Sequence, residues 1–144
     1  MQLKLISVLI TSFVLVIFVY AGIDDNQDIQ GSWIPVSAEM SGKKVPDQVL
    51  KTMKFVLADG KYTIKNGDLA DLGTYKLDQN AKPRAIDMTC TEGLNQGNTI
   101  QAIYELSGDT LKICYDTTGD DRPSEFKSLA GTQLFLVTYK REKK

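Results

Sequence analysis

Apolar and polar residues alternate along most of this chain beyond residue 30. Tyr62 and Ile64 lie on one side of one such segment, and Ile86, Met88 and Cys90 lie on one side of another. A period of two is that of a β-strand with one face turned inward, and it leaves little room for helix. We therefore predict strands over 34–40, 54–57, 61–65, 72–77, 84–91, 98–106, 110–116 and 133–141.

The turns between these segments predict how the strands are joined. Asp59-Gly60 and Asn66-Gly67 tolerate the positive φ angles of tight hairpins, so neighbouring strands should run antiparallel. About eight short strands joined in this way are typical of a closed barrel, so we predict an all-β fold with an up-and-down topology. A small β-sandwich is the alternative. The residues expected to face inward from the first strand are Ile34, Val36, Ala38 and Met40.

One short helix is predicted after the first strand, over 46–53. Pro46 suits the first turn of a helix, and Val49, Leu50 and Met53 fall on one face. A helix of this length is too short to stand alone. We interpret it as a lid over one mouth of the barrel.

The first residues predict export. Lys4 precedes an apolar run over 5–19 that ends in Val19-Tyr20-Ala21, a plausible site for a signal peptidase. We predict a signal peptide over 1–21, a flexible linker over 22–27 and a domain over 28–142, in a secreted or periplasmic protein without stable membrane association. An uncleaved N-terminal membrane anchor is the alternative, because the run approaches the length that spans a bilayer.

The composition excludes several functions. The chain has no histidine, so it holds neither a Ser-His-Asp nor a Cys-His nucleophilic pair, nor a histidine-based metal site. With 17 basic and 18 acidic residues it has no broad positive surface for nucleic acid. Paired carboxylates are chemically possible, but the acids are scattered through turns. We predict a non-enzymatic protein with no cofactor and no metal, and we expect a monomer.

The two cysteines, Cys90 and Cys114, fall in strands that another predicted strand separates. Residues on strands that are two apart in a sheet lie about 9–10 Å from each other, which exceeds the roughly 7 Å between Cα atoms that a disulfide allows. We therefore expect two buried free thiols, although strand twist leaves a disulfide open.

A series of short motifs resembles an uncharacterised family of bacterial lipocalin-like domains, which are usually exported. The likeness covers about 28–142, and it departs from the family at Cys90, where proline is more common. It implies a lipocalin-like eight-stranded barrel and no established activity or ligand. It also implies that Trp33 closes the narrow end beneath Arg141 or Lys140 of the last strand. The motifs are Gln30-Gly31-Ser32-Trp33, Gly42-Lys43-Lys44-Val45-Pro46, Gly73-Thr74-Tyr75-Lys76-Leu77-Asp78, Lys82-Pro83-Arg84-Ala85-Ile86-Asp87-Met88-Thr89, Ile103-Tyr104-Glu105-Leu106, Arg122-Pro123-Ser124-Glu125-Phe126 and Tyr139-Lys140-Arg141-Glu142.

An eight-stranded barrel has an interior that side chains fill or that holds one small molecule. The inward residues Met88, Ala102 and Tyr104 suit either a cavity or a packed core. Arg122 and Glu125 either line a barrel mouth or form an ion pair within their loop. We predict an exported domain that binds a small apolar or amphipathic ligand at Met88, Ala102, Tyr104 and Arg122. A solid barrel that binds a protein or cell-envelope partner through its loops or a strand edge is the alternative.

Overall fold

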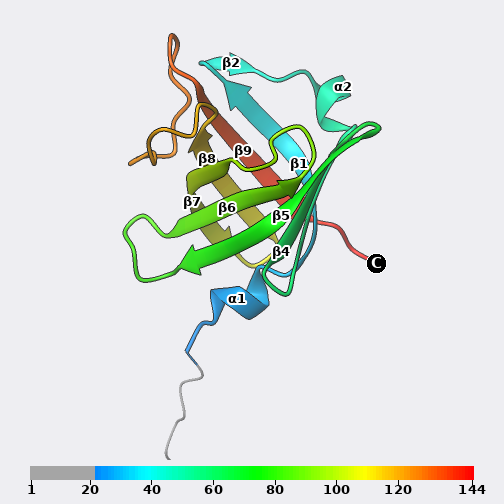
Figure 1. Cartoon of the computed structure of the whole chain (residues 1–144), viewed down its shortest axis with the longest axis vertical. Coiled ribbons are helices and arrows are strands. Elements are labelled where there is room, and N and C mark those ends of the chain that lie inside the picture. The colour runs from blue at the N-terminus through cyan, green and yellow to red at the C-terminus, as the bar shows by residue number, and fades with distance from the viewer. Residues whose placement is uncertain (1–21) are drawn as a thin grey trace, which may run out of the picture.

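The computed structural model describes residues 22–144 and shows a barrel of β-strands (Figure 1). The predicted signal peptide over 1–21, and the alternative of a membrane anchor, lie outside the described residues. No helix within the described part of the chain has the length and apolar character to span a membrane. In chain order the elements are α1 (Asp25–Asp28), β1 (Gly31–Met40), β2 (Lys43–Lys44), α2 (Asp47–Leu50), β3 (Met53–Ala58), β4 (Lys61–Asn66), β5 (Leu69–Asp78), β6 (Ala85–Glu92), β7 (Thr99–Ser107), β8 (Thr110–Asp116) and β9 (Leu134–Arg141).

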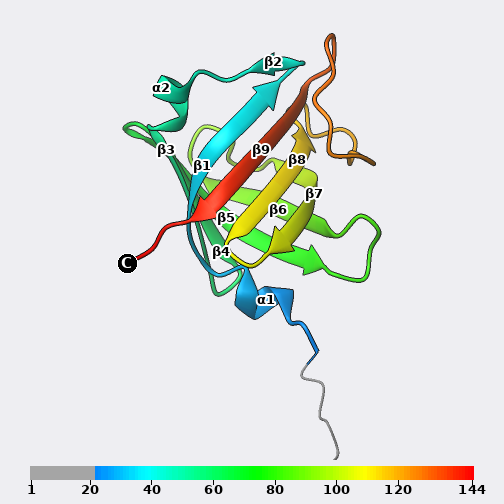
Figure 2. The ribbon, with the colours of Figure 1, turned by 180° about the vertical axis from the view of Figure 1, so that it is seen from behind.

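The strands form a closed antiparallel barrel. Nine strands make one sheet, and all but the two-residue β2 run around the barrel, each pairing with its neighbour in the chain. The last strand, β9, pairs with β1 from Trp33↔Arg141 to Met40↔Phe135, so the sheet closes on itself (Figure 2). The predicted eight-stranded up-and-down barrel is confirmed, and the alternative β-sandwich is wrong.

The barrel interior is one cluster of apolar side chains that the alternating pattern turns inward. Trp33, Leu57, Ile86 and Val137 are each fully buried in it. At roughly 25 cal/mol for each Å² of apolar surface, this burial is the main force that holds the strands together.

The alternation predicted for the first strand fails at one place. Trp33 and Pro35 are buried, but Val36 is 50% exposed and Ala38 is again buried. The β1–β9 register shifts between Pro35 and Ser37, which marks a β-bulge. A bulge adds one residue to a strand and switches the side chains beyond it to the other face. Ile34 and Val36 therefore do not face inward with Ala38 and Met40 as predicted.

The helix predicted over 46–53 forms, but it is shorter. It spans Asp47–Leu50, with Pro46 as its N-cap. Leu50 reaches the core at 3% exposure, whereas Val49 stays 42% exposed. The hydroxyl of Thr52, just after the helix, donates to Asn66 at the end of β4. The helix is thus held at the end of the barrel that bears the β4–β5 turn (Figure 1).

Trp33 closes the opposite end. Its ring is fully buried, and its Nε1 donates to the carbonyl of Ile29 at 2.8 Å. The guanidinium of Arg141 stacks over the ring, 4.3 Å from its centroid, and also donates to the carbonyls of Asp28 and Gln30, at 2.6 Å each. Lys140, the other candidate, instead donates to Thr110. Arg141 therefore fixes the chain before β1 over the closed end.

The segment over 22–27, predicted as a flexible linker, is ordered from Asp25 onward. Asp25–Asp28 forms α1, and the side chain of Asp25 is buried. Its Oδ2 accepts from Arg84 Nη1 at 2.8 Å and from the Tyr104 hydroxyl at 2.6 Å. A buried carboxylate needs such partners, because desolvation would otherwise disfavour its charged form. The boundary predicted at residue 28 therefore lies too late in the chain.

The cysteines are free and buried, as expected. Cys90 is on β6 and Cys114 on β8, with β7 between them. The Cys114 thiol donates to the carbonyl of Lys127, in the long segment that connects β8 to β9. Burial raises the pKa of this thiol, so it stays protonated at neutral pH.

We predict that Trp33→Ala lowers the free energy of unfolding by about 3–5 kcal/mol, as removal of a large buried aromatic usually does. Arg141→Lys should also destabilise, because an ammonium cannot keep the two parallel bonds to the carbonyls. Urea denaturation of each variant measures the loss, with Lys140→Arg as a matched control. A Trp33→Ala loss below about 1 kcal/mol would show that Trp33 does not close the barrel.

A second prediction concerns the buried carboxylate at α1. Arg84→Met should lower the free energy of unfolding by about 3–5 kcal/mol, because it leaves the charge of Asp25 without its cation. Tyr104→Phe removes one hydrogen bond to the same oxygen and should cost about 1.5–3 kcal/mol. Chemical denaturation compares the two. Equal stability of wild type and a chain that begins at residue 28 would restore the linker interpretation.

A third prediction follows from the tyrosines. Burial raises the pKa of Tyr115 from 10 to about 12, and it also raises the pKa values of Tyr62, Tyr75, Tyr104 and Tyr139. Above pH 10 the unfolded chain loses phenolic protons that the folded chain keeps, so stability falls with rising pH. We expect the free energy of unfolding to be constant just below that pH and to fall above it. Urea denaturation across this range, with tyrosinate absorbance, tests this; phenols that ionise at pH 10 without unfolding would contradict it.

Candidate functional site

Three of the residues predicted to bind a ligand lie in the packed core. Met88, Ala102 and Tyr104 are 2%, 0% and 1% exposed and belong to the same apolar cluster. The hydroxyl of Tyr104 points to the closed end, where it bonds to Asp25. The structure thus brings the three together as core. The barrel also has a cavity at the end away from Trp33, and none of the three residues lines it.

That cavity has a volume of about 520 Å³ and lies at the end of the barrel opposite Trp33. The ends of six strands surround it, and we call it the mouth cavity. Its volume falls within the range of small-molecule sites, roughly 300–1,000 Å³. The lining residues are Met53, Tyr62, Ile64, Asn66, Leu69, Ala70, Asp71, Cys90, Leu94, Asn95, Gly97, Asn98, Thr99, Ile100, Tyr115, Thr117, Thr118 and Gly119.

The strand pairing explains why the barrel is open here. The β7–β8 ladder ends at Ala102↔Tyr115, so the first residues of β7, Thr99 to Gln101, pair with β6 alone. The two strands separate beyond that point. The side of the mouth cavity between them is lined by Thr99 and Ile100 from β7, and by Tyr115 and the segment that follows β8.

A glycine shapes the wall formed by β4, β5 and β6. A Cβ at Gly73 would lie 2.0 Å from the carbonyl oxygen of Thr89 and 2.7 Å from the ring of Tyr62. Only glycine lets β6 and the Tyr62 ring approach β5 so closely. The Tyr62 side chain, 4% exposed, is therefore held inside the barrel at the edge of the mouth cavity.

The chemistry of the mouth cavity is mixed. Apolar side chains come from β3, β4 and β7, and the Tyr62 and Tyr115 phenols add polar atoms. Burial is the main cause that raises the pKa of both phenols, and for Tyr115 it rises to about 12. Both hydroxyls are therefore neutral hydrogen-bond donors at pH 7. An apolar wall with a few neutral polar groups is typical of small-molecule binding sites.

None of the residues that line the mouth cavity was among those that the sequence predicted to bind a ligand. Tyr62 and Ile64 share one face of their predicted strand, and Ile100 falls on the same alternation as Ala102 and Tyr104, but nothing in the pattern showed how far along the barrel each one lies. Asp71 falls before the predicted start of its strand at residue 72, whereas β5 begins at Leu69. The signal was present, because Asp71, Gly73 and Tyr75 follow the same alternation.

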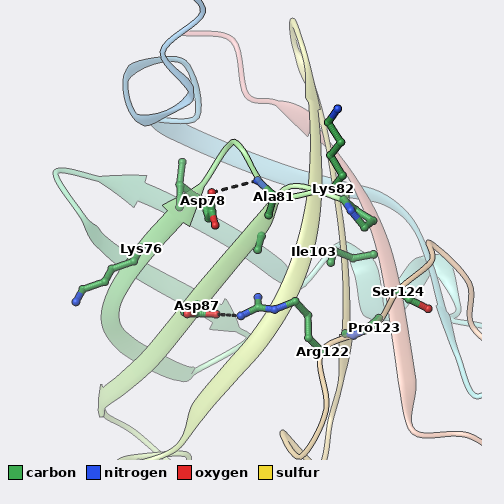
Figure 3. Close-up of a pocket in the computed structure, with 12 residues that line it drawn as sticks. Lys76, Asp78, Ala81, Lys82, Asp87, Ile103, Arg122, Pro123 and Ser124 are labelled. Carbon is green, nitrogen blue, oxygen red and sulfur yellow. Dashed lines mark hydrogen bonds and ion pairs between the residues drawn. The ribbon is translucent and has the colours of Figure 1, made fainter.

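Arg122 does not lie at the mouth. It comes from the segment between β8 and β9 and lies outside the barrel, against β6 and β7 (Figure 3). Its Nη1 donates to the carbonyl of Ala102 at 2.7 Å, and its Nη2 pairs with Asp87 at 2.6 Å. Glu125 pairs with Lys127. Both predicted roles of Arg122, at the mouth or in an ion pair with Glu125, are therefore wrong.

Arg122 forms one wall of a second hollow, about 450 Å³ in volume, on the outer surface. Ile103 and Ala85 also line it. Ala81 and Lys82 of the β5–β6 turn border it on the side away from Arg122 (Figure 3). Lys76 and Lys82 extend away from it in this view. The Arg122 guanidinium is already paired with Asp87, and the Asp78 carboxylate accepts hydrogen bonds from the backbone of its own turn. Two of the charged groups that line this hollow are therefore already bonded within the protein.

No group of three or more acidic or cysteine side chains within residues 22–144 is arranged to hold a metal ion. Comparisons of the chain with protein-family models, with curated proteins and with solved structures found no match. The resemblance to exported lipocalin-like domains therefore stays a prediction from the sequence motifs. What the structure establishes is the closed eight-stranded barrel and its mouth cavity.

Proposed function

We propose that this chain is an exported, non-enzymatic protein that binds one small, largely apolar or amphipathic molecule in the mouth cavity. The observation that carries the proposal is the contrast between the two ends of the barrel. Inside the barrel the closed end is packed around Trp33 and Tyr104, whereas the open end has a cavity of about 520 Å³ that opens to solvent. A larger hollow of about 950 Å³ near the closed end is formed by the chain ends beside Arg141. Eight strands are wide enough to hold one small ligand once part of the interior is left unfilled.

The wall of the cavity supports a ligand of this class. Ile64 and Ile100 give it apolar surface, and Leu94, 79% exposed, stands at its rim with Leu69. Exposed leucines beside a cavity extend the apolar surface that a ligand meets on entry. The asparagine and threonine side chains can orient a polar group, as the few polar groups of ligand pockets generally do.

The predicted lid, α2, lies at the open end of the barrel, but none of its own residues lines the mouth cavity. It packs on β1, and Met53, which follows it, lines the mouth cavity. Leu50 anchors it in the core, and the hydrogen bonds that tie Thr52 to the β4–β5 turn fix its far end. A lid movement of α2 that widens the cavity would have to carry Met53 with it, and so would open the Met53↔Asn66 pair at the end of the β3–β4 ladder.

Substitutions that fill the mouth cavity with a larger side chain test the proposal. We expect Ile100→Trp and Ile64→Trp to abolish binding of a neutral apolar dye such as Nile red, because the added ring volume occupies the ligand space. Val36→Trp, at a 50% exposed position on the outside of β1, is the control and should bind as wild type does. Fluorescence titration measures the dye, with circular dichroism to show that each variant is folded.

Native mass spectrometry of the protein from its own host gives a second measurement. A bound small molecule that the tryptophan variants lose would support the proposal. If wild type neither binds dye nor retains a ligand, the proposal that this protein is a carrier of a small molecule fails. The alternative, a barrel that binds a protein or cell-envelope partner through its loops, would then take its place.

A further inference from the structure

The charge of the mouth cavity is carried by a single side chain. Among the described residues that line it, Asp71 is the only acidic or basic one. Within residues 22–144, no lysine or arginine forms an ion pair with Asp71. The one carboxylate of the lining therefore has no ion-pair partner among the described residues.

Asp71 is also incompletely bonded. Its Oδ2 accepts from Asn95 Nδ2 at 2.6 Å. Its Oδ1 is buried and has no hydrogen-bond partner, the one such side-chain atom in the described residues. A carboxylate accepts up to about four hydrogen bonds, and a buried oxygen with none costs free energy. Native proteins leave few such atoms, so each calls for an explanation.

The segment after β6 covers this carboxylate. A Cβ at Gly93 would lie 2.1 Å from Oδ1, so the backbone there rests directly against the oxygen. Asn95, two residues on, holds Oδ2. A ligand ammonium can replace the Asn95 amide on Oδ2 or displace the backbone at Gly93 from Oδ1. The first exchange turns the amide–carboxylate hydrogen bond at Oδ2 into an ion pair, and the second gives Oδ1 the partner that it lacks.

The phenols nearby fit the same kind of group. After burial, the negative charge of Asp71 is the next cause that raises the pKa of Tyr115, and it adds to the effects of burial and of Cys90 on the pKa of Tyr62. The Asp71 carboxylate is thus close enough to interact electrostatically with both phenols. Tyrosine rings also attract a cation placed over their faces.

We propose that the mouth cavity selects a ligand with a protonated amine on an apolar body, and that Asp71 is the residue that selects it. This inference rests on the proposed function and names the chemistry of its ligand. The amine pairs with the Asp71 carboxylate, and the apolar body lies along Ile64 and Ile100. An anionic amphiphile of the same size is rejected by the same charge.

The experiment compares three probes with the same eight-carbon chain: octylamine, octanol and octanoate. Each displaces a neutral dye from wild type, at neutral pH and constant ionic strength. We expect octylamine to bind about tenfold more tightly than octanol, a difference of about 1.4 kcal/mol, and octanoate to bind most weakly. Asp71→Asn should lose the preference for the amine and still bind octanol.

Asp68→Asn is the matched control. Asp68 is exposed in the neighbouring β4–β5 turn and does not line the cavity, so this variant removes the same charge without touching the site. It should keep the wild-type order. The ranking of the three probes on wild type decides the question even if Asp71→Asn fails to fold.

The outcomes separate the two proposals. If no probe displaces the dye and no dye binds, the proposed function itself fails. If the dye binds but the amine has no advantage over octanol, or octanoate binds best, the role of Asp71 is overturned and the carrier function stands. Loss of the amine preference in Asp68→Asn as well would show that general surface charge, and not Asp71, sets it.

Discussion

The pairing of β1 with β9 is the interaction on which the rest of the structure depends. It joins the first and last strands of the barrel, removes both sheet edges and sets Trp33 opposite Arg141. The stack of the guanidinium on the indole therefore follows from barrel closure. The same guanidinium binds the carbonyls of Asp28 and Gln30, so the chain before β1 is fixed by the strand that ends the barrel. Closure thus orders residues well outside the ladder.

The alternating pattern predicted the barrel because it reports a local property, the face on which each side chain lies. It failed where a single residue changes that face, at the bulge between Pro35 and Ser37. It also failed for α1, a polar four-residue helix with no periodic signal. Asp25 becomes part of the core only because Arg84 and Tyr104, far away in sequence, meet it there. Contacts of this kind depend on the finished fold.

The candidate site was missed for a related reason. Alternation gives the inward face but not the depth along the barrel axis, which the stagger between strands sets. Met88 and Tyr104 face inward as predicted, yet they lie in the packed part, whereas Ile100 on the same strand as Tyr104 reaches the cavity. Arg122 was placed at a mouth because its loop precedes the last strand. That segment instead lies against the outside of β6 and β7, where Asp87 and the Ala102 carbonyl hold it.

The two ends of the barrel differ in how completely their side chains are packed and hydrogen-bonded. At the closed end, a buried carboxylate, a phenol and two guanidinium groups are all hydrogen-bonded, and Trp33 fills the space between the strands. At the open end, a hollow and the unbonded oxygen of Asp71 both disfavour the folded state. Sites where a sequence departs from full packing and full hydrogen bonding are those where function most often lies. A firmly held closed end lets the fold tolerate an unfilled mouth, and a ligand that fills it and bonds to Asp71 would stabilise the barrel by binding only its folded form.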